Sequence, residues 1–281
     1  MDAVLLINKP TGMTSFSVVS QCRKAFHEKK AGHTGTLDPN ASGLMIVLLG
    51  RCTKLAPYCA SGHKHYRAEF ILGQSYDTED VWGTPVEEKT PRIYEEDILQ
   101  RTTARFIGVS EQIPPMYSAI KVQGRKLYDL AREGKTIERQ ARKICVYSLE
   151  VHHLRGNTYT MDAVVSSGTY IRTLIADYAR ALGEFGAMSR LCREGIEQLA
   201  LSDADELDDV IAGNYHEVNI LHVLDPSYPV IEYADAQWIR NGRPVQLDCS
   251  EHTVILVNNS SVLAAYELRD DGLYHCARGL F

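Results

Sequence analysis

The chain has 281 residues, enough to bury a large core and to form one large domain plus a smaller one. Its hydrophobic content of 44% and charged content of 23% are those of an ordinary soluble globular protein. No apolar run reaches the length of a membrane span and no basic-then-apolar leader precedes Val4, so we expect a cytoplasmic protein. The seven cysteines are scattered without a CxxC pair, which predicts reduced thiols and no zinc site.

Charge is distributed unevenly along the chain, although the formal net charge is −6. Residues 1–67 carry nine Lys/Arg against three Asp/Glu, and residues 121–143 carry eight against three. Residues 201–281 carry four against fourteen. Phosphates respond to the local electrostatic potential more than to the net charge, so the two basic segments are compatible with a nucleic-acid partner.

The first predicted elements are a strand and a helix. Val4 to Ile7 is an apolar run typical of a buried strand, and a polar turn at residues 8–10 ends it. Lys9 in this turn could be a plain solvated residue. Thr14 or Ser15 can cap the helix that follows, whose apolar spacing predicts a buried face of Phe16, Val19 and Cys22.

The stretch from Ala31 to Gly50 is the one around which the rest of the chain is organised. It begins as a glycine-rich loop and ends in the apolar run Leu44 to Leu49, which predicts a buried strand. Its single acid, Asp38, precedes a proline that restricts its backbone. A lone carboxylate on a stiff loop suits chemistry, although Asp38 could equally bond nearby amides in a plain turn.

Further on, Thr53 to Ala60 predicts a short helix, and Tyr66 to Leu72 alternates as a strand does, with Tyr66, Ala68 and Phe70 on one face. A strand tyrosine is usually a core residue, so the alternation by itself gives Tyr66 no chemical role. Tyr94 to Ile107 has the spacing of an amphipathic helix.

Basic side chains gather between residues 113 and 143, where Tyr117 and Tyr128 are interleaved with them. This composition is typical of an arm that follows nucleic-acid phosphates, although a solvated charged helix would have it too. The basic residues are Lys121, Arg125, Lys126, Arg132, Lys135, Arg139, Arg142 and Lys143.

A helix is expected from Tyr170 to Leu182, ended by Gly183. Arg172 in its first turn opposes the helix dipole, so the placement needs a partner such as a carboxylate. Residues 144–151 and 158–165 predict a hairpin, residues 203–214 a short acidic helix, and the segment from about Pro229 a small all-β module.

Several motifs together resemble one enzyme family. GHTGTLDPNASG, around Asp38, is similar to the catalytic-loop motif of the TruB family of bacterial tRNA pseudouridine synthases, which modify the T-loop uridine at position 55. Matches in the family's order extend over roughly residues 4 to 200. They include INKPTGMTS, GRCTK, HYRAEFILGQ, SYDTED, QIPPMYSAIKVQGRKLYDLAREG, SSGTYIRTL and RLCREG.

The resemblance implies an α/β (α+β) fold. A mixed, largely antiparallel sheet flanked by helices would occupy residues 1–225, and a PUA-like all-β domain residues 226–281. The family carries an RNA-gripping insertion at about 113–143, which implies that Lys121, Arg125 and Lys126 face the tRNA. The acidic character of the C-terminal module makes it the weaker candidate for RNA contact.

The resemblance also implies roles for individual residues. Asp38 matches the catalytic aspartate, Arg172 the arginine that pairs with it, and Tyr66 the tyrosine that stacks on the target base and can remove a proton. On the substrate side, the resemblance implies that His33 fills the gap left by the flipped base and that Leu191 forms a wall of the base pocket. It also implies that Lys9 braces the catalytic loop and that Tyr170 adds a further contact.

Pseudouridine formation exchanges one bond of the uracil for another and gains no group, so we expect no cofactor and no metal. We expect a monomer that acts on the T-arm of tRNA without an obligate protein partner. Two alternatives are a tRNA-binding chaperone that folds RNA and a guide-RNA-dependent pseudouridine synthase.

Overall fold

In a computed structural model of the chain, residues 1–118, 120–122, 124–135 and 137–280 are described. For four of these residues the description covers the backbone alone: Lys121, Val122, Lys126 and Arg132. The chain forms two compact units, the first of Met1–Gly62 with Gly195–Phe281 and the second of His63–Glu194. Within the described ranges, no helix is long and apolar enough to cross a membrane.

The first unit is built on the antiparallel pair β1 (Ala3–Lys9) and β3 (Ser42–Leu49), in which Ile7 lies opposite Met45. Three short strands add to it: β2 (Ala31–His33) pairs with β3, β14 (Asp205–Glu206) runs parallel to β1, and β13 (Leu199–Ala200) pairs with the end of β12 (Gly186–Ile196).

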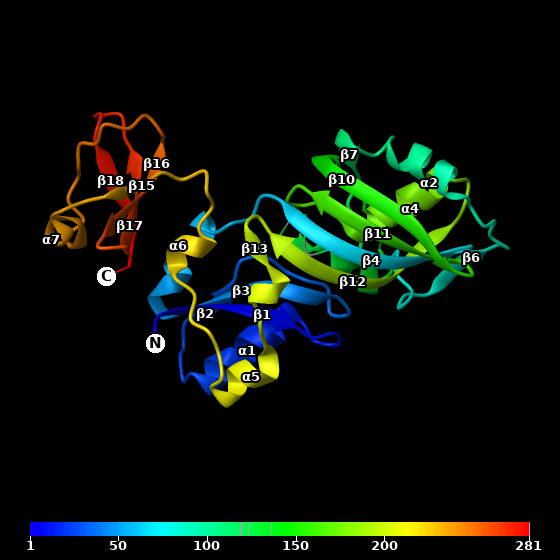
Figure 1. The fold of residues 1–281 in the computed structure, drawn as a ribbon, viewed down its shortest axis with the longest axis horizontal. Coiled ribbons are helices and arrows are strands. Elements are labelled where there is room, and N and C mark those ends of the chain that lie inside the picture. Colours follow the sequence, from blue (N-terminus) through cyan, green and yellow to red (C-terminus); the bar gives the residue numbers. More distant parts are fainter. Residues whose placement is uncertain (119, 123, 136, 281) are drawn as a thin grey trace. The chain divides into compact units, whose positions relative to one another are not determined.

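Both faces of this pair of strands are covered, which is why their sequences are continuous apolar runs. On one face, α1 (Ser15–Ala25) and α5 (Leu207–Ala212) pack on Leu5, Ile7 and Val47 (Figure 1). On the other face, the 3-10 helix η1 (Gly50–Tyr58) and α6 (Ile220–Val223) contribute Cys52 and Val223 to a second apolar cluster.

The second unit is a sheet in the order β12-β4-β11-β10-β7. Its strands are β4 (Lys64–Leu72), β7 (Gly108–Gln112), β10 (Arg142–Arg155) and β11 (Thr158–Val165), and the pairs β4–β11, β11–β10 and β10–β7 are antiparallel. The helices α2 (Glu96–Thr103) and α4 (Ile171–Ala181) accompany it, and Tyr178 of α4 packs edge-on against Phe70 of β4.

Smaller elements complete both units. In the second unit they are the hairpins β5 (Gln74–Tyr76) with β6 (Pro85–Glu88) and β8 (Lys121–Val122) with β9 (Arg125–Lys126), and the helix α3 (Leu127–Arg132). In the first unit the 3-10 helix η2 (Leu201–Asp203) precedes β14.

The C-terminal part of the first unit is a four-stranded sheet with one short helix. The sheet consists of β15 (Val230–Glu232), β16 (Thr253–Asn258), β17 (Ser261–Leu268) and β18 (Tyr274–Gly279), and the helix is α7 (Ala236–Arg240). The outer side of β16 and β17 packs on Leu55 and Tyr58 of η1, and Lys54 donates a hydrogen bond to the carbonyl of Gly279 at 2.8 Å.

The fold confirms the predicted α/β (α+β) class, since both units combine helices with strands that pair mainly antiparallel. Four details of the prediction were wrong. Phe16 is 69% exposed, and the helix expected over 94–107 is confined to α2. The stretch around Asp38 begins as strand β2, and the C-terminal module contains α7.

Candidate active site

Asp38 lies in the loop between β2 and β3 of the first unit. Its carbonyl accepts a hydrogen bond from the N–H of Ala41 at 3.1 Å, which closes a tight turn over residues 38–41. The turn that the residues alone suggested is therefore present. Asp38 itself is half-buried, and Leu37 before it is buried.

The turn at residues 8–10 braces this loop, as the family resemblance implied. The side chain of Lys9 is fully buried, and its Nζ donates to the carbonyl of Pro10 at 2.8 Å and to that of Pro39 at 3.1 Å. Burial excludes a solvated role for Lys9. Because Pro39 directly follows Asp38, the ammonium group fixes the backbone on one side of the carboxylate.

Ser15 fixes the backbone on the other side. Its Oγ accepts from the N–H of Leu37 at 2.9 Å and donates to the carbonyl of the same residue at 3.2 Å. The predicted capping role belongs to Thr14, whose hydroxyl accepts from the N–H of Ser17 at 3.0 Å. Ser15 is thus turned toward the loop of Asp38.

Arg172 is the second residue of α4 in the second unit, and only 4% of it is exposed. Its Nη1 and Nη2 donate to the carbonyls of Thr78 and Tyr117, both at 2.9 Å, and its Nε lies 3.9 Å from Oδ2 of Asp80. A buried guanidinium needs acceptors for its N–H groups, and these contacts explain how a cation is held in the first turn of a helix. The pairing of Arg172 with Asp38 stays a prediction.

The turn that receives Arg172 is attached to α4 a second time. Glu79 in this turn has a φ of +63°, in the left-handed region that non-glycine residues rarely adopt. Its carboxylate accepts from the hydroxyl of Thr173 at 2.6 Å. Burial raises the pKa of Glu79, while the Thr173 hydrogen bond and the charge of Arg172 oppose that shift. Two successive residues at the start of α4 are therefore held by one turn.

Tyr66 lies on β4 and is 8% exposed, on the buried face with Ala68 and Phe70, as the alternation predicted. Its backbone pairs with that of Ala163 on β11. Leu191 on β12 is also buried, at 6% exposure. Both belong to the second unit, and their proposed contacts with a base stay predictions.

Tyr170 immediately precedes α4, and its backbone is held by the side chain of Gln112. The N–H of Tyr170 donates to Oε1 of Gln112 at 2.8 Å, and its carbonyl accepts from Nε2 at 3.1 Å. Gln112 is buried at the end of β7. His33 is the last residue of β2, opposite Val47, and is half-buried.

The basic insertion is partly neutralised by one acid. The guanidinium of Arg125 pairs with Glu133, and Nζ of Lys135 lies 2.9 Å from the other oxygen of that carboxylate. These two hydrogen bonds, Arg125 first, lower the pKa of Glu133 to about 2. The predicted RNA contacts of Lys121 and Lys126 concern side chains outside the described part of the chain.

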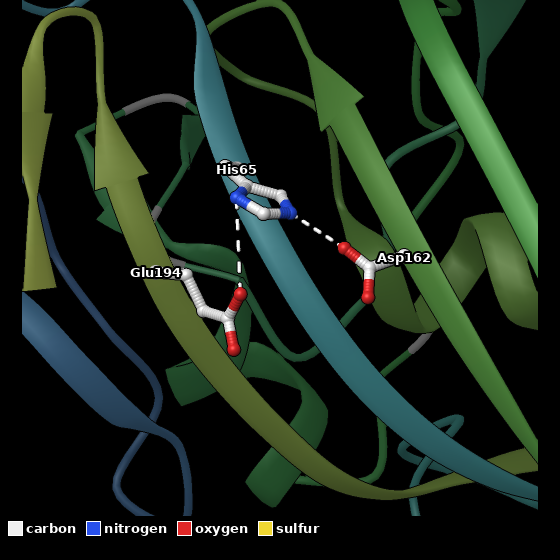
Figure 2. A group of neighbouring side chains, drawn as sticks. All are labelled: His65, Asp162 and Glu194. Carbon is white, nitrogen blue, oxygen red and sulfur yellow. Dashed lines mark hydrogen bonds and ion pairs between the residues drawn. The ribbon is translucent and has the colours of Figure 1, made fainter.

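A group of three side chains in the second unit has the composition of a metal site. His65 on β4 lies between Asp162 on β11 and Glu194 on β12, with 2.5 Å to the first carboxylate and 3.8 Å to the second (Figure 2). Arg67 already contacts the same two carboxylates, at 2.9 and 3.2 Å. Burial would raise the pKa of Asp162, but the hydrogen bonds from His65 and Arg67 lower it. The guanidinium occupies the position of a cation, so these residues do not fit a metal ion.

Comparison with known proteins gives a consistent result. A family model for TruB family pseudouridylate synthases (N-terminal domain) matches residues 23–171, a range that includes Asp38 and Tyr66 and ends one residue before Arg172. The tRNA pseudouridine synthase B of Oenococcus oeni is 38% identical over 288 residues, which cover 97% of this chain and 96% of that protein. The chain belongs to the TruB family. A TruB relative of the same name from Clostridium kluyveri is 42% identical over 208 residues, covering 74% of this chain and 72% of that protein.

Solved structures show that the TruB chain shares a fold with chains of two larger assemblies. A chain of a Cbf5-Nop10-Gar1 complex superposes with a TM-score of 0.71 at 23% identity, covering 94% of this chain and 78% of that chain. A chain of an H/ACA RNP bound to a substrate RNA containing 2′-deoxyuridine gives 0.72 at 20% identity, covering 99% and 85%. At this identity the likeness concerns the fold, and it confirms the expected fold class.

Sequence reasoning missed the residues that hold the site from outside. Ser15 was expected only as an alternative to Thr14 for the helix cap, and no role was expected for Gln112 or Glu79. Their neighbours Phe16, Glu111 and Ile113 are exposed, so nothing in the local pattern marks Ser15 or Gln112 as buried polar groups that need partners.

Proposed function

We propose that this chain converts uridine to pseudouridine at position 55 in the T-loop of tRNA. The observation that carries the proposal is the support of Asp38, whose two neighbours are fixed by Ser15 and Lys9 in a loop inside the range that the TruB family model matches. A half-buried carboxylate on a backbone held at both sides suits a reaction that needs one positioned acid. Membership in the TruB family, with relatives named tRNA pseudouridine synthase B, supports the same substrate.

The reaction is an isomerisation, so atoms balance within the nucleotide. The bond between C1′ and N1 breaks, the uracil rotates, and a bond forms between C1′ and C5. The proton on C5 is then removed, and N1 gains a proton. Asp38 acts at the ribose, either as the nucleophile that bonds C1′ and is displaced when C5 attacks it, or as the base that takes the proton from C2′ and returns it when the C1′–C5 bond has formed.

The other residues bind the uracil or orient Asp38. Tyr66 stacks on the uracil and takes the C5 proton through its hydroxyl, and Leu191 forms an apolar wall of the pocket. Arg172 orients Asp38 with its planar fork. A T-loop base is stacked, so the enzyme flips it out at a cost of a few kcal/mol, and His33 fills the gap. Tyr170 adds a contact on the substrate side.

The basic insertion grips the T-arm through phosphates, with Arg125, Lys121 and Lys126 as contacts. Residues 1–225 form the catalytic domain and residues 226–281 a PUA-like domain. The enzyme is a cytoplasmic monomer that needs no guide RNA and no obligate protein partner.

The test is a reaction with two components, the pure protein and one unmodified tRNA transcript. We expect pseudouridine at position 55 and nowhere else, detected by mass spectrometry after chemical labelling. A guide-dependent enzyme would give no product, and a chaperone would change the folding of the transcript without modifying it. Either result would overturn the proposal.

A further inference from the structure

One hydroxyl group bonds both polar backbone groups of the residue before Asp38. Ser15 Oγ accepts from the N–H of Leu37 at 2.9 Å and donates to its carbonyl at 3.2 Å. Both residues are buried, with 2% and 4% of their surfaces exposed. Because a hydroxyl has one donor and two acceptor lone pairs, this side chain does for Leu37 what a neighbouring strand does for a residue in a sheet.

The helix does not require this hydroxyl for itself. Thr14 caps α1, and Ser15 is the first helical residue. Val18 and Cys22 anchor α1 in the same apolar cluster as β1 and β3. The hydroxyl is therefore presented from a rigid base to a segment 22 residues further along the chain.

The loop depends on such support. Residues 36–38 belong to no helix or strand in the part of the chain that the structure describes, yet Leu37 is buried. Buried backbone groups are nearly always paired, so the conformation before Asp38 requires a partner from elsewhere. After Asp38, the turn to Ala41 and the bond from Lys9 to Pro39 fix the chain. Asp38 thus lies between two fixed points.

We infer that Ser15 is a positioning residue for the reaction of Asp38: its hydroxyl locks Leu37 and thereby sets where the carboxylate stands. The inference rests on the proposed function, in which Asp38 acts on the ribose. Ser15 is 2% exposed and bonds Leu37, so it acts on the position of Asp38 through that residue. Losing its hydroxyl should slow the chemical step and leave binding of tRNA unchanged, because Ser15 is buried and the proposed RNA contacts are other residues.

The test compares Ser15→Ala with two controls on the same helix. Ser20→Ala changes an exposed serine, and Val19→Ala opens a cavity in the core without touching the loop of Asp38. For each protein we would measure the single-turnover rate with enzyme in excess, the Kd for one tRNA, the thermal midpoint, and hydrogen exchange at the amide of Leu37.

For Ser15→Ala we expect a rate about 10- to 100-fold lower, a Kd within about twofold of wild type, and exchange at Leu37 at least about tenfold faster. Ser20→Ala should match wild type, and Val19→Ala should lose stability while keeping its rate. Ser15→Cys keeps the shape with a weaker donor, so its rate should lie between those of wild type and Ser15→Ala. This variant carries the test if Ser15→Ala does not fold.

A folded Ser15→Ala protein with a rate within twofold of wild type would overturn the inference. So would an equal loss of rate in Val19→Ala at an equal loss of stability, since the effect would then be general. No product from the wild type would overturn the proposed function and this inference with it. Product from the wild type and an unimpaired Ser15→Ala would overturn the inference alone.

Discussion

The salt dependence of tRNA binding tests whether the basic insertion grips phosphates. We would replace Arg125 and Lys126 by alanine. The ion pair between Arg125 and Glu133 is 49% and 43% exposed at its two side chains, so water screens it and a phosphate can replace the acid at little cost. Each phosphate contact contributes about 0.9 to the slope of log K against log salt. Losing two contacts should therefore flatten the slope by about 1.8.

The same ion pair predicts that replacing Glu133 has the opposite effect on tRNA binding. Glu133 holds both Arg125 and Lys135, and because its pKa is lowered to about 2 it stays ionised throughout any practical assay range. Glu133→Gln removes this competitor of the phosphates. It should tighten binding at low salt and steepen the slope by up to about 0.9.

The assay is the affinity for one tRNA between about 50 and 200 mM salt, a range over which each contact is worth roughly 3.5-fold. Arg240→Ala with Arg243→Ala, in the acidic C-terminal module, is the matched control and should change the slope less. Saturating turnover of the insertion variant should stay within a few-fold of wild type. Equal slopes in wild type, insertion variant and control would refute the reasoning and make the insertion a solvated charged surface.

Three further changes test the site. Arg172→Lys should reduce turnover nearly as much as Arg172→Ala, because one ammonium cannot bond the carbonyls of Thr78 and Tyr117 as two guanidinium nitrogens do; turnover near wild type would show that charge alone suffices. Tyr66→Phe should keep tRNA affinity and slow the final proton removal, so that a rearranged intermediate accumulates; an unchanged rate would leave the hydroxyl without a role. Lys9→Met removes the charged donor that bonds the carbonyls of Pro10 and Pro39, and each such hydrogen bond is worth about 1.5 to 3 kcal/mol. The variant should therefore have a lower free energy of unfolding and a lower turnover. Unchanged stability in calorimetry and an unchanged rate would show that Lys9 does not brace the loop.

The elements that the sequence predicted well are those whose pattern is local. The apolar runs of β1 and β3 reflect burial on both faces, and the alternation of β4 reflects burial on one. The prediction that Phe16 is buried was wrong for a geometric reason. At 100° per residue, the buried residues of α1 centre between Val18 and Val19, and Phe16 falls about 110° away from that centre, in solvent.

The resemblance implied one support of the Asp38 loop, Lys9, but the supports from Ser15 and Gln112 had no signal in the sequence. Asp38 stands out by its motif, while the bonds from Ser15 to Leu37 and from Gln112 to Tyr170 join residues 22 and 58 positions apart. Such pairs follow from tertiary packing, for which a single sequence has no local signal. Arg172 was expected to need a partner such as a carboxylate, and the second unit supplies two backbone carbonyls together with the carboxylate of Asp80 at 3.9 Å.

The central claim is that the carboxylate of Asp38 does the chemistry, and Asp38→Asn tests it most directly. The change keeps the shape of the side chain and removes its charge. We would measure pseudouridine at position 55 of one tRNA under single-turnover conditions, with tRNA affinity and thermal midpoint measured in parallel. We expect no detectable product, with affinity and stability close to wild type. A rate within tenfold of wild type would contradict it.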